Sequence, residues 1–309
     1  MGKNRSLKAQ LKFAVQKCQR FGQSKHADKK NPEIYTKEGV YSISSSDALK
    51  DTVTNFANFM SEKHPEIGYV RDITVDHINE WIAYRQADWS NKTYDNMVSR
   101  IGKMELLLNK TYHLELDLTT GLMHRPKDRQ DKEEIRNKAM SRDDLRDLIA
   151  YMKNSTSPNG WIALEITSRC GLRVKEVSCL RFSNIDTDNK VIHVVEGAKN
   201  GRKRDVAIRD KDILFFRKFC REYGNQEYVT GGIKEDSINK SIRRAMQAIG
   251  IDLKYKETTE HAVRKLYASE RYQEELKKTN DKKKAFTAVQ HDLGHGDFRT
   301  KLFDTYVYL

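Results

Sequence analysis

Apolar residues recur at helical spacing along most of this chain, and they alternate with polar residues in one short stretch. The first helical stripe consists of Leu7, Leu11, Ala14, Val15 and Cys18. Such a stripe predicts an amphipathic helix, because its members fall on one helix face. Lysine and arginine dominate the residues around it. We therefore expect residues 1–45 to form a basic arm that contains a helix; a solvated tail that adds only solubility is the alternative.

A second region with helical periodicity begins near Ser46. Ser46 can cap a helix that ends near Pro65, where proline interrupts the pattern. Two further helices follow, each opened by a residue type that favours N-caps. The expected caps are Thr74 or Asp76 for one helix, and Asn91 or Thr93 for the other. The pattern predicts one helical domain over residues 46–123.

The second half of the chain is separated from this domain by residues 124–140, which are rich in charge and contain Pro126. Such a composition is typical of a linker. Ser141, with an acid three residues later, resembles a capped helix start, so we expect a second domain over residues 141–309. Its period changes to two at Val191, His193 and Val195, and again at Val206 and Ile208. Two such runs joined by a lysine- and glycine-rich turn predict a hairpin, and the fold class is mainly α with a small β-hairpin.

Composition adds strong positive charge to this picture. The 309 residues include 57 lysines and arginines against 44 acids, a formal net charge of +13. Such an excess attracts polyanions, because each cation placed on a phosphate releases a condensed counterion. Nucleic acid is the leading partner. A membrane is the weaker one, since no stretch approaches the roughly 20 apolar residues that a span requires.

The cysteines and histidines indicate neither a disulfide framework nor a metal site. The four cysteines, Cys18, Cys170, Cys179 and Cys220, are scattered and form no CxxC pair. Reduced thiols in a cytoplasmic protein are the better interpretation, and no signal peptide is evident. His291 and His295 have one spacing that suits a metal, but Asp292 stands where a HExxH site needs glutamate. We expect no metal and no cofactor.

Three short motifs follow one another in the second domain: Gly171-Leu172-Arg173 with Glu176, His261 to Arg264, and Leu293-Gly294-His295. Tyr306 and Tyr308 come next. Each motif alone is weak, because HxxR recurs by chance and an arginine near a glutamate is most often a surface ion pair. Together they supply two guanidiniums to grip phosphate oxygens, histidines to move a proton, and a phenol as nucleophile. These groups can break a phosphodiester bond without a metal.

The order and local wording of the motifs resemble the tyrosine recombinase (phage integrase) family, over about residues 141–309. Residues 166–177 are similar to the first arginine box of that family, and residues 180–186 continue it. The turn in residues 196–206 is similar to the one that carries the catalytic lysine. The family's second box matches His261 and Arg264, and its Leu-Gly-His motif matches His295. Residues 46–123 are similar in size and place to the core-binding (SAM-like) domain.

The resemblance implies roles for individual residues. The catalytic set is Arg173, Lys199, His261, Arg264, His295 and a tyrosine, with Glu176 in support and Lys203 as the second candidate for the lysine. DNA contacts are expected from Lys203, Arg202 and Arg204 on the hairpin and from Lys8 and Lys12 on the arm. The implied activity is site-specific DNA recombination through a covalent 3′-phosphotyrosine, with strand exchange between two double-stranded sites. The implied partners are further copies in a tetramer and accessory DNA-bending proteins, in the cytoplasm on the nucleoid.

Two departures from the family pattern leave alternatives open. Lys265 follows Arg264, where family members often carry a second histidine. Both candidate tyrosines lie farther from His295 than is usual. Spacing favours Tyr306, whereas the ending Thr305-Tyr306-Val307-Tyr308-Leu309 resembles the end of some phage integrases and favours Tyr308, which we take as the nucleophile. A type IB topoisomerase and a non-catalytic DNA-binding protein with this fold are the other interpretations.

Overall fold

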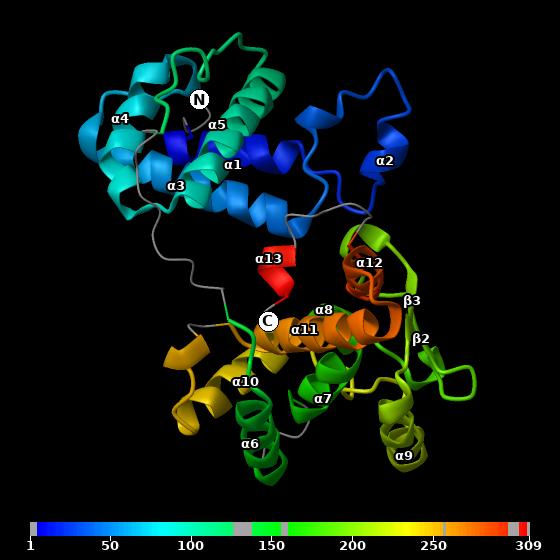
Figure 1. Cartoon of the computed structure of the whole chain (residues 1–309). Helices are drawn as coiled ribbons and strands as arrows, with labels where there is room; N and C mark the ends of the chain where they lie inside the picture. Colours follow the sequence, from blue (N-terminus) through cyan, green and yellow to red (C-terminus); the bar gives the residue numbers. More distant parts are fainter. Residues whose placement is uncertain (1–4, 126–137, 156–159, 256–257, 296–302, 308–309) are drawn as a thin grey trace. The chain divides into compact units, whose positions relative to one another are not determined.

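A computed structural model describes residues 5–125, 138–155, 160–255, 258–295 and 303–307 of the chain. The chain divides into two compact units, Met1–Glu133 and Glu134–Leu309, and each is described by itself (Figure 1). No helix among the described residues is both long and apolar enough to cross a membrane.

The first unit is helical. Its helices are α1 (Leu7–Lys17), α2 (Lys25–Asp28), α3 (Ile43–Lys63), α4 (Val75–Arg85) and α5 (Asn91–Tyr112), with 3-10 turns at Thr36–Glu38, Val70–Asp72 and Gln86–Asp88. Thr74, one of the two caps expected from the sequence, caps α4. Helix α3 begins earlier than expected, because the Ser42 hydroxyl accepts a hydrogen bond from the backbone N–H of Ser45 at 3.2 Å. Ser46, the expected cap, is buried inside the helix.

Helix α1 is part of the core of this unit. Leu11 and Val15 are buried in the same apolar cluster as Phe56 of α3 and Leu108 of α5. The expected division placed α1 in an arm ahead of the helical domain, but its apolar stripe is covered by α3 and α5. The lysines on the opposite face, among them Lys12, remain exposed.

The second unit combines helices with a small antiparallel sheet. Its helices are α6 (Arg142–Asn154), α7 (Gly160–Cys170), α8 (Val174–Ser178), α9 (Ile213–Tyr223), α10 (Glu235–Ala248), α11 (Glu260–Thr279), α12 (Lys282–Asp292) and α13 (Phe303–Tyr306). The strands are β1 (Ile185–Asp186), β2 (Val191–Val194) and β3 (Arg204–Ala207). They pair antiparallel in the order β1-β2-β3, with Ile192 opposite Val206. The mainly α fold with a hairpin is confirmed, and β1 adds a third strand that the alternation did not reveal.

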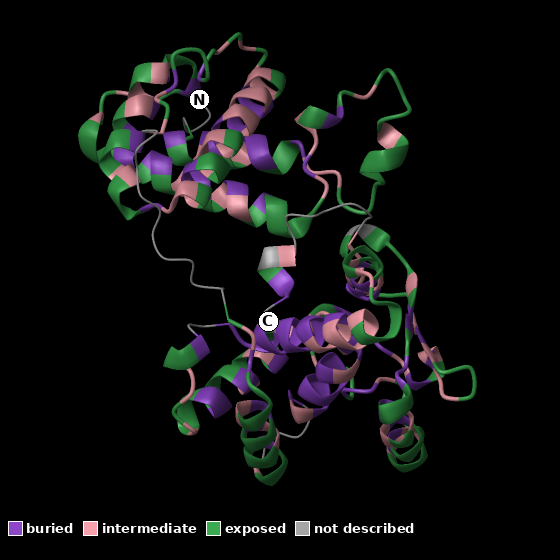
Figure 2. Cartoon of the chain, viewed as in Figure 1, coloured by how far each residue is buried: buried purple, intermediate pink, exposed green. Residues whose placement is uncertain are grey.

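Helices α7 and α11 form the centre of the second unit. Figure 2 shows α7 and much of α11 as buried, and α11 is covered by α7, α12 and α13. An apolar cluster joins Leu164 and Ile166 of α7 to Val263 of α11 and to the inner face of the hairpin. A second cluster, with Tyr267 and Tyr272 at its centre, attaches α12 and α13 to α11. Both tyrosines are buried and serve packing. The three motifs therefore lie close to the end of α7, the start of α11 and the end of α12, and both α7 and α12 pack against α11.

Candidate active site

The glycine of the first motif brings the two arginine motifs together. Gly171 ends α7 with a φ of +63°, and a Cβ at this position would lie 2.4 Å from Cδ1 of Tyr267. Only glycine fits there, because both the left-handed backbone and the contact exclude a side chain. Its carbonyl oxygen accepts a hydrogen bond from the guanidinium of Arg264. Arg173, two residues on, is then placed at the start of α8.

Glu176 on α8 lies within 4 Å of the guanidinium groups of three arginines. Its carboxylate is 1% exposed and accepts two hydrogen bonds from Arg204, at 2.8 and 2.9 Å. It also accepts hydrogen bonds from Nη1 of Arg173 at 2.9 Å and from the backbone N–H of Arg173 at 2.8 Å. Nη1 of Arg264 lies 3.9 Å away. Burial alone would raise the pKa of Glu176, but the hydrogen bonds and charge of Arg204, helped by the other two arginines, lower it to about 2.

Arg264 is held rigidly at the centre of the site. It is 0% exposed and also donates a hydrogen bond to the carbonyl oxygen of Leu293 at 2.6 Å. Burial, followed by the positive charge of Arg173, lowers the pKa of Arg264 to about 10, so its guanidinium stays charged at neutral pH. Its buried Nε finds no hydrogen-bond partner among the described residues. A buried cation with a spare donor is ready to receive an anion.

Tyr306 lies among the histidines and Arg264. Helix α13 packs on α11, and there the ring centroid of Tyr306 lies 5.5 Å from that of His261 and 5.0 Å from that of His295. Cζ of Arg264 lies 5.8 Å from the ring centroid of Tyr306. The structure therefore brings four of the predicted residues, counting Tyr306 as the alternative nucleophile, into one cluster. Tyr308, the preferred candidate, lies outside the described residues.

The third motif supports this cluster through its backbone. Gly294 has a φ of +63° and turns the chain after α12, next to the guanidinium of Arg204. This turn presents the Leu293 carbonyl to Arg264 and fixes His295, whose N–H donates to the carbonyl oxygen of Gln290 at 2.9 Å. Each residue of the motif thus has a separate task.

The hairpin turn is anchored beside α8. A Cβ at Gly197 would lie 2.6 Å from the carbonyl oxygen of Lys175, so the backbones approach closely. Lys199, Arg202 and Lys203 are exposed on this turn. Arg204 differs from the prediction of a DNA contact: its side chain is 7% exposed. Its guanidinium binds Glu176 and the carbonyl oxygen of Asp292, because a carboxylate buried beside three arginines needs a bidentate partner.

Sequence reasoning missed Glu260 and one cavity of the site. Glu260 opens α11 and is buried, although an acid in the first turn of a helix is normally a solvated residue. Together with Arg173 and His261 it lines a cavity of about 440 Å³. Helix α10 also lines this cavity, through Asp236, Asn239, Lys240 and Arg243. The periodicity of α10 predicted a helix but gave no sign that these side chains face the site.

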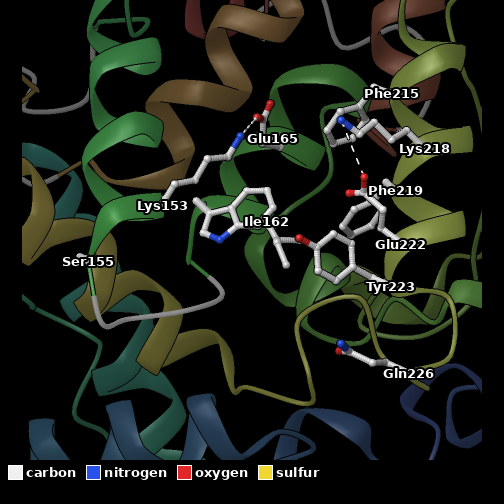
Figure 3. A pocket seen from close by; sticks show the side chains of 11 residues that line it. Lys153, Ser155, Ile162, Glu165, Phe215, Lys218, Phe219, Glu222, Tyr223 and Gln226 are labelled. Carbon is white, nitrogen blue, oxygen red and sulfur yellow. Dashed lines mark hydrogen bonds and ion pairs between the residues drawn. The ribbon is translucent and has the colours of Figure 1, made fainter.

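A larger cavity, of about 670 Å³, lies in another part of the second unit (Figure 3). It is lined by aromatic residues of α7 and α9, including Trp161, Phe215 and Tyr223. Figure 3 shows two ion pairs at its rim, Lys153 with Glu165 at 3.1 Å and Lys218 with Glu222 at 3.7 Å. None of the candidate catalytic residues lines it, so the larger cavity is not the candidate active site.

Metal ligands and disulfides are not found in the part of the chain that the structure describes. No three histidine, cysteine or acidic side chains there are grouped to hold a metal ion. The four cysteines are free.

Comparison with known proteins identifies a family and a fold. The model of the phage integrase family matches residues 138–300, more than half of the chain. Similar solved structures include a lambda integrase fragment bound to DNA, with a TM-score of 0.64 at 14% identity, covering 98% of this chain and 96% of that one. The XerH site-specific recombinase bound to a palindromic difH substrate has a TM-score of 0.60 at 13% identity, covering 99% and 94%. A lambda integrase tetramer bound to a Holliday junction has 0.62 at 14%, covering 97% and 80%. No curated protein sequence matches the chain.

Proposed function

Because this chain belongs to the phage integrase family, we propose that it is a site-specific recombinase that cuts and rejoins DNA through a covalent 3′-phosphotyrosine. The observation that carries the proposal is the meeting of Arg264, His261, His295 and Tyr306 in one cluster of the second unit, with Arg173 joined to Arg264 through Glu176. The reaction needs no metal and no ATP, because guanidiniums stabilise the phosphate and the phosphotyrosine conserves the bond energy.

The two arginines have different tasks in this reaction. Arg264 is buried and fixed by carbonyl oxygens, so its guanidinium offers a preorganised donor to a non-bridging oxygen. Arg173 is partly exposed and faces the cavity, so it can meet the incoming phosphodiester. As the tyrosine oxygen bonds to phosphorus, the bond to the 5′-oxygen breaks. His261 takes the proton of the phenol, and Lys199 on the hairpin protonates the departing oxygen.

We propose Tyr306 as the nucleophile in place of Tyr308. The ring of Tyr306 lies beside both histidines, and the guanidinium of Arg264 lies over it with Cζ 5.8 Å from the ring centroid. A nucleophile must lie within reach of its base, and Tyr306 meets this requirement through His261.

DNA is the proposed partner, and the cavity beside Arg173 gives it a path. Lys240 and Arg243 of α10 line that cavity and can contact the strand next to the scissile phosphate. Arg202 and Lys203 on the hairpin, together with Lys8 and Lys12 on α1, are exposed and remain proposed phosphate contacts. A tetramer on two duplexes is proposed because the fold matches a lambda integrase tetramer on a Holliday junction. Accessory DNA-bending proteins and a place on the nucleoid in the cytoplasm complete the proposal.

Covalent trapping tests the chemistry. The full chain is incubated with a pool of nicked random-sequence duplexes, in which the cleaved strand end diffuses away, and denaturant-stable protein–DNA complexes are counted. We expect a covalent complex that forms in the presence of a chelator and disappears in Tyr306→Phe. Tyr151→Phe removes the hydroxyl of an exposed tyrosine on α6 and should leave trapping unchanged.

The other outcomes each exclude part of the proposal. Loss of trapping in Tyr308→Phe with normal trapping in Tyr306→Phe would reverse the choice of nucleophile. Binding without any covalent complex would mean a non-catalytic DNA-binding protein. Relaxation of supercoiled DNA without transfer to a second duplex would mean a topoisomerase.

A further inference from the structure

Glu260 is a buried acid at the junction of the two arginine motifs. It is 4% exposed, it precedes His261 on α11, and it lines the cavity beside Arg173. Its Oε1 accepts a hydrogen bond from Oγ1 of Thr167 on α7 at 2.7 Å. The backbone N–H of Val174, at the start of α8, also hydrogen-bonds to it. The carboxyl group therefore joins α7, α8 and α11 where the motifs meet.

The hydroxyl of Thr167 can serve both protonation states of this carboxyl group. It lies 2.7 Å from Oε1 of Glu260 and 3.3 Å from the carbonyl oxygen of Leu172, but it has one proton to donate. When Glu260 is ionised, Thr167 donates to the carboxylate. When Glu260 is protonated, the acid can donate to Thr167, and Thr167 donates to Leu172. In both states Thr167 and Glu260 keep a hydrogen bond to each other, which lowers the usual cost of moving a proton in a core.

The charge of the site favours the protonated acid when DNA is bound. Three guanidiniums, those of Arg173, Arg204 and Arg264, share the ionised Glu176, which leaves two positive charges. An ionised Glu260 reduces this to one. A phosphodiester brings one negative charge, and more negative charge gathers on its oxygens in the transition state. A neutral Glu260 leaves both positive charges for the phosphate.

We infer that Glu260 is a positioning residue that takes up one proton from solvent when a DNA phosphodiester binds beside Arg173. The proton transfers the hydrogen bond of Thr167 to the carbonyl oxygen of Leu172, the residue that precedes Arg173. Binding of the phosphate and placement of the arginine that holds it are thereby coupled. The inference rests on the proposed function, because the phosphodiester is the ligand.

The electrostatic surroundings of Glu260 support this role. Burial raises its pKa to about 7, against the hydrogen bond from Thr167 and the positive charge of Arg264. The charged or titratable groups that face it are His261 and Arg264 on α11, Arg173 and Glu176 on α8, and Asp236, Lys240 and Arg243 on α10. A bound phosphate adds negative charge and raises the pKa further. Above pH 7 the free protein is ionised at Glu260, so DNA binding requires a proton and weakens as the pH rises. Below pH 7 the proton is already present and this dependence disappears.

Calorimetry with the full chain tests the inference. The probe is one duplex selected from random-sequence DNA by binding to the wild-type chain. Titrations above pH 7 in two buffers of different ionisation enthalpy should show uptake of close to one proton. The affinity should fall by up to about tenfold per pH unit there. Glu260→Gln, which is neutral and nearly isosteric, should lose that proton and that slope. Glu222→Gln, on exposed α9, is the matched control and should keep both.

Each outcome decides the matter. The inference fails if the wild-type chain takes up no proton above pH 7, a measurement that needs no variant. It also fails if Glu260→Gln keeps the uptake, because the proton then belongs to another group, such as His261. Thr167→Val removes the hydroxyl that supports the ionised acid, so proton uptake should extend to higher pH; unchanged uptake would contradict the hydrogen-bond exchange. Covalent trapping is read separately. Trapping without proton uptake overturns the role of Glu260 alone, and uptake without trapping overturns the proposed chemistry.

Discussion

Replacing Glu176 by glutamine should destabilise the second unit more than any change at its surface. Glutamine keeps the shape of the side chain and removes its charge. Arg204 and Arg264, at 7% and 0% exposed, then lose the counterion that holds them in the interior. A buried cation without a partner costs far more than the pair contributes, because it cannot regain its hydration.

The structure sets the size of the loss. A glutamate with an ordinary pKa of 4.5 that falls to about 2 in the folded chain gains about 3 kcal/mol of stability from its charge at neutral pH. Breaking a buried ion pair by removing one partner costs about 3–5 kcal/mol in general. The two figures agree, so we expect Glu176→Gln to lose about 3 kcal/mol at pH 7. Since the folded pKa is lowered, this contribution is present above pH 4.5 and disappears as the pH falls towards 2.

The assay must report on the second unit alone. The urea dependence of hydrogen exchange in peptides from α7 and α11 gives its free energy of unfolding without interference from the first unit. Glu222→Gln removes an exposed glutamate 3.7 Å from Lys218 and should change the free energy by less than about 0.5 kcal/mol. A loss below about 1 kcal/mol in Glu176→Gln would refute the view that this carboxylate holds the cluster together. In the double variant with Arg204→Gln the losses should not add, because neither change then leaves its partner charged and alone; additive losses would also refute it.

Three further predictions concern other parts of the chain. Gly171→Ala should cost about 1–3 kcal/mol and lower covalent trapping, because φ is +63° and the new Cβ meets Tyr267 at 2.4 Å; urea unfolding measures it. Leu11→Ala should cost the first unit about 2–5 kcal/mol, whereas Lys12→Gln should leave stability unchanged and reduce the salt dependence of DNA binding. Glu260→Gln should be more stable than the wild type above pH 7, by up to about 3 kcal/mol, and the difference should vanish by pH 4.5, since a raised acid pKa makes the ionised form the destabilising one.

The sequence predicted the helices and strands better than it predicted which of them pack together. The caps at Thr74 and Ser141 were predictable, because a short polar side chain before an apolar stripe indicates a helix start from neighbouring residues alone. The place of α1 was not, since an apolar stripe shows that a face is covered and says nothing of which helices cover it. The burial of Arg204 follows the same rule. A cation in a basic turn resembles its exposed neighbours until its distance to Glu176 is known.

The candidate catalytic groups could be singled out from the sequence because they fall in motifs, whereas only one of the two buried acids beside them, Glu176, lies in a motif. Glu176 was found through its place in the first motif. Glu260 has no motif, and the sequence gives no reason why an acid before His261 should be buried. The burial of Glu260 depends on a long-range contact, because the hydroxyl that donates a hydrogen bond to it belongs to Thr167, 93 residues earlier in the chain.

The two buried acids show how one cluster of arginines can hold a fixed and a variable charge. Glu176 accepts two hydrogen bonds from the guanidinium of Arg204. They stabilise its ionised form and lower its pKa. Glu260 accepts hydrogen bonds from a hydroxyl and a backbone N–H. These offset only part of the effect of burial, so its pKa rises to about 7. Arg264 donates to the carbonyl oxygens of Gly171 and Leu293, which fix its position without neutralising its charge, and it shares the single charge of Glu176 with two other guanidiniums. The backbone therefore builds the site, Glu176 keeps it intact without DNA, and the positive charge that remains is the part that a phosphate can use.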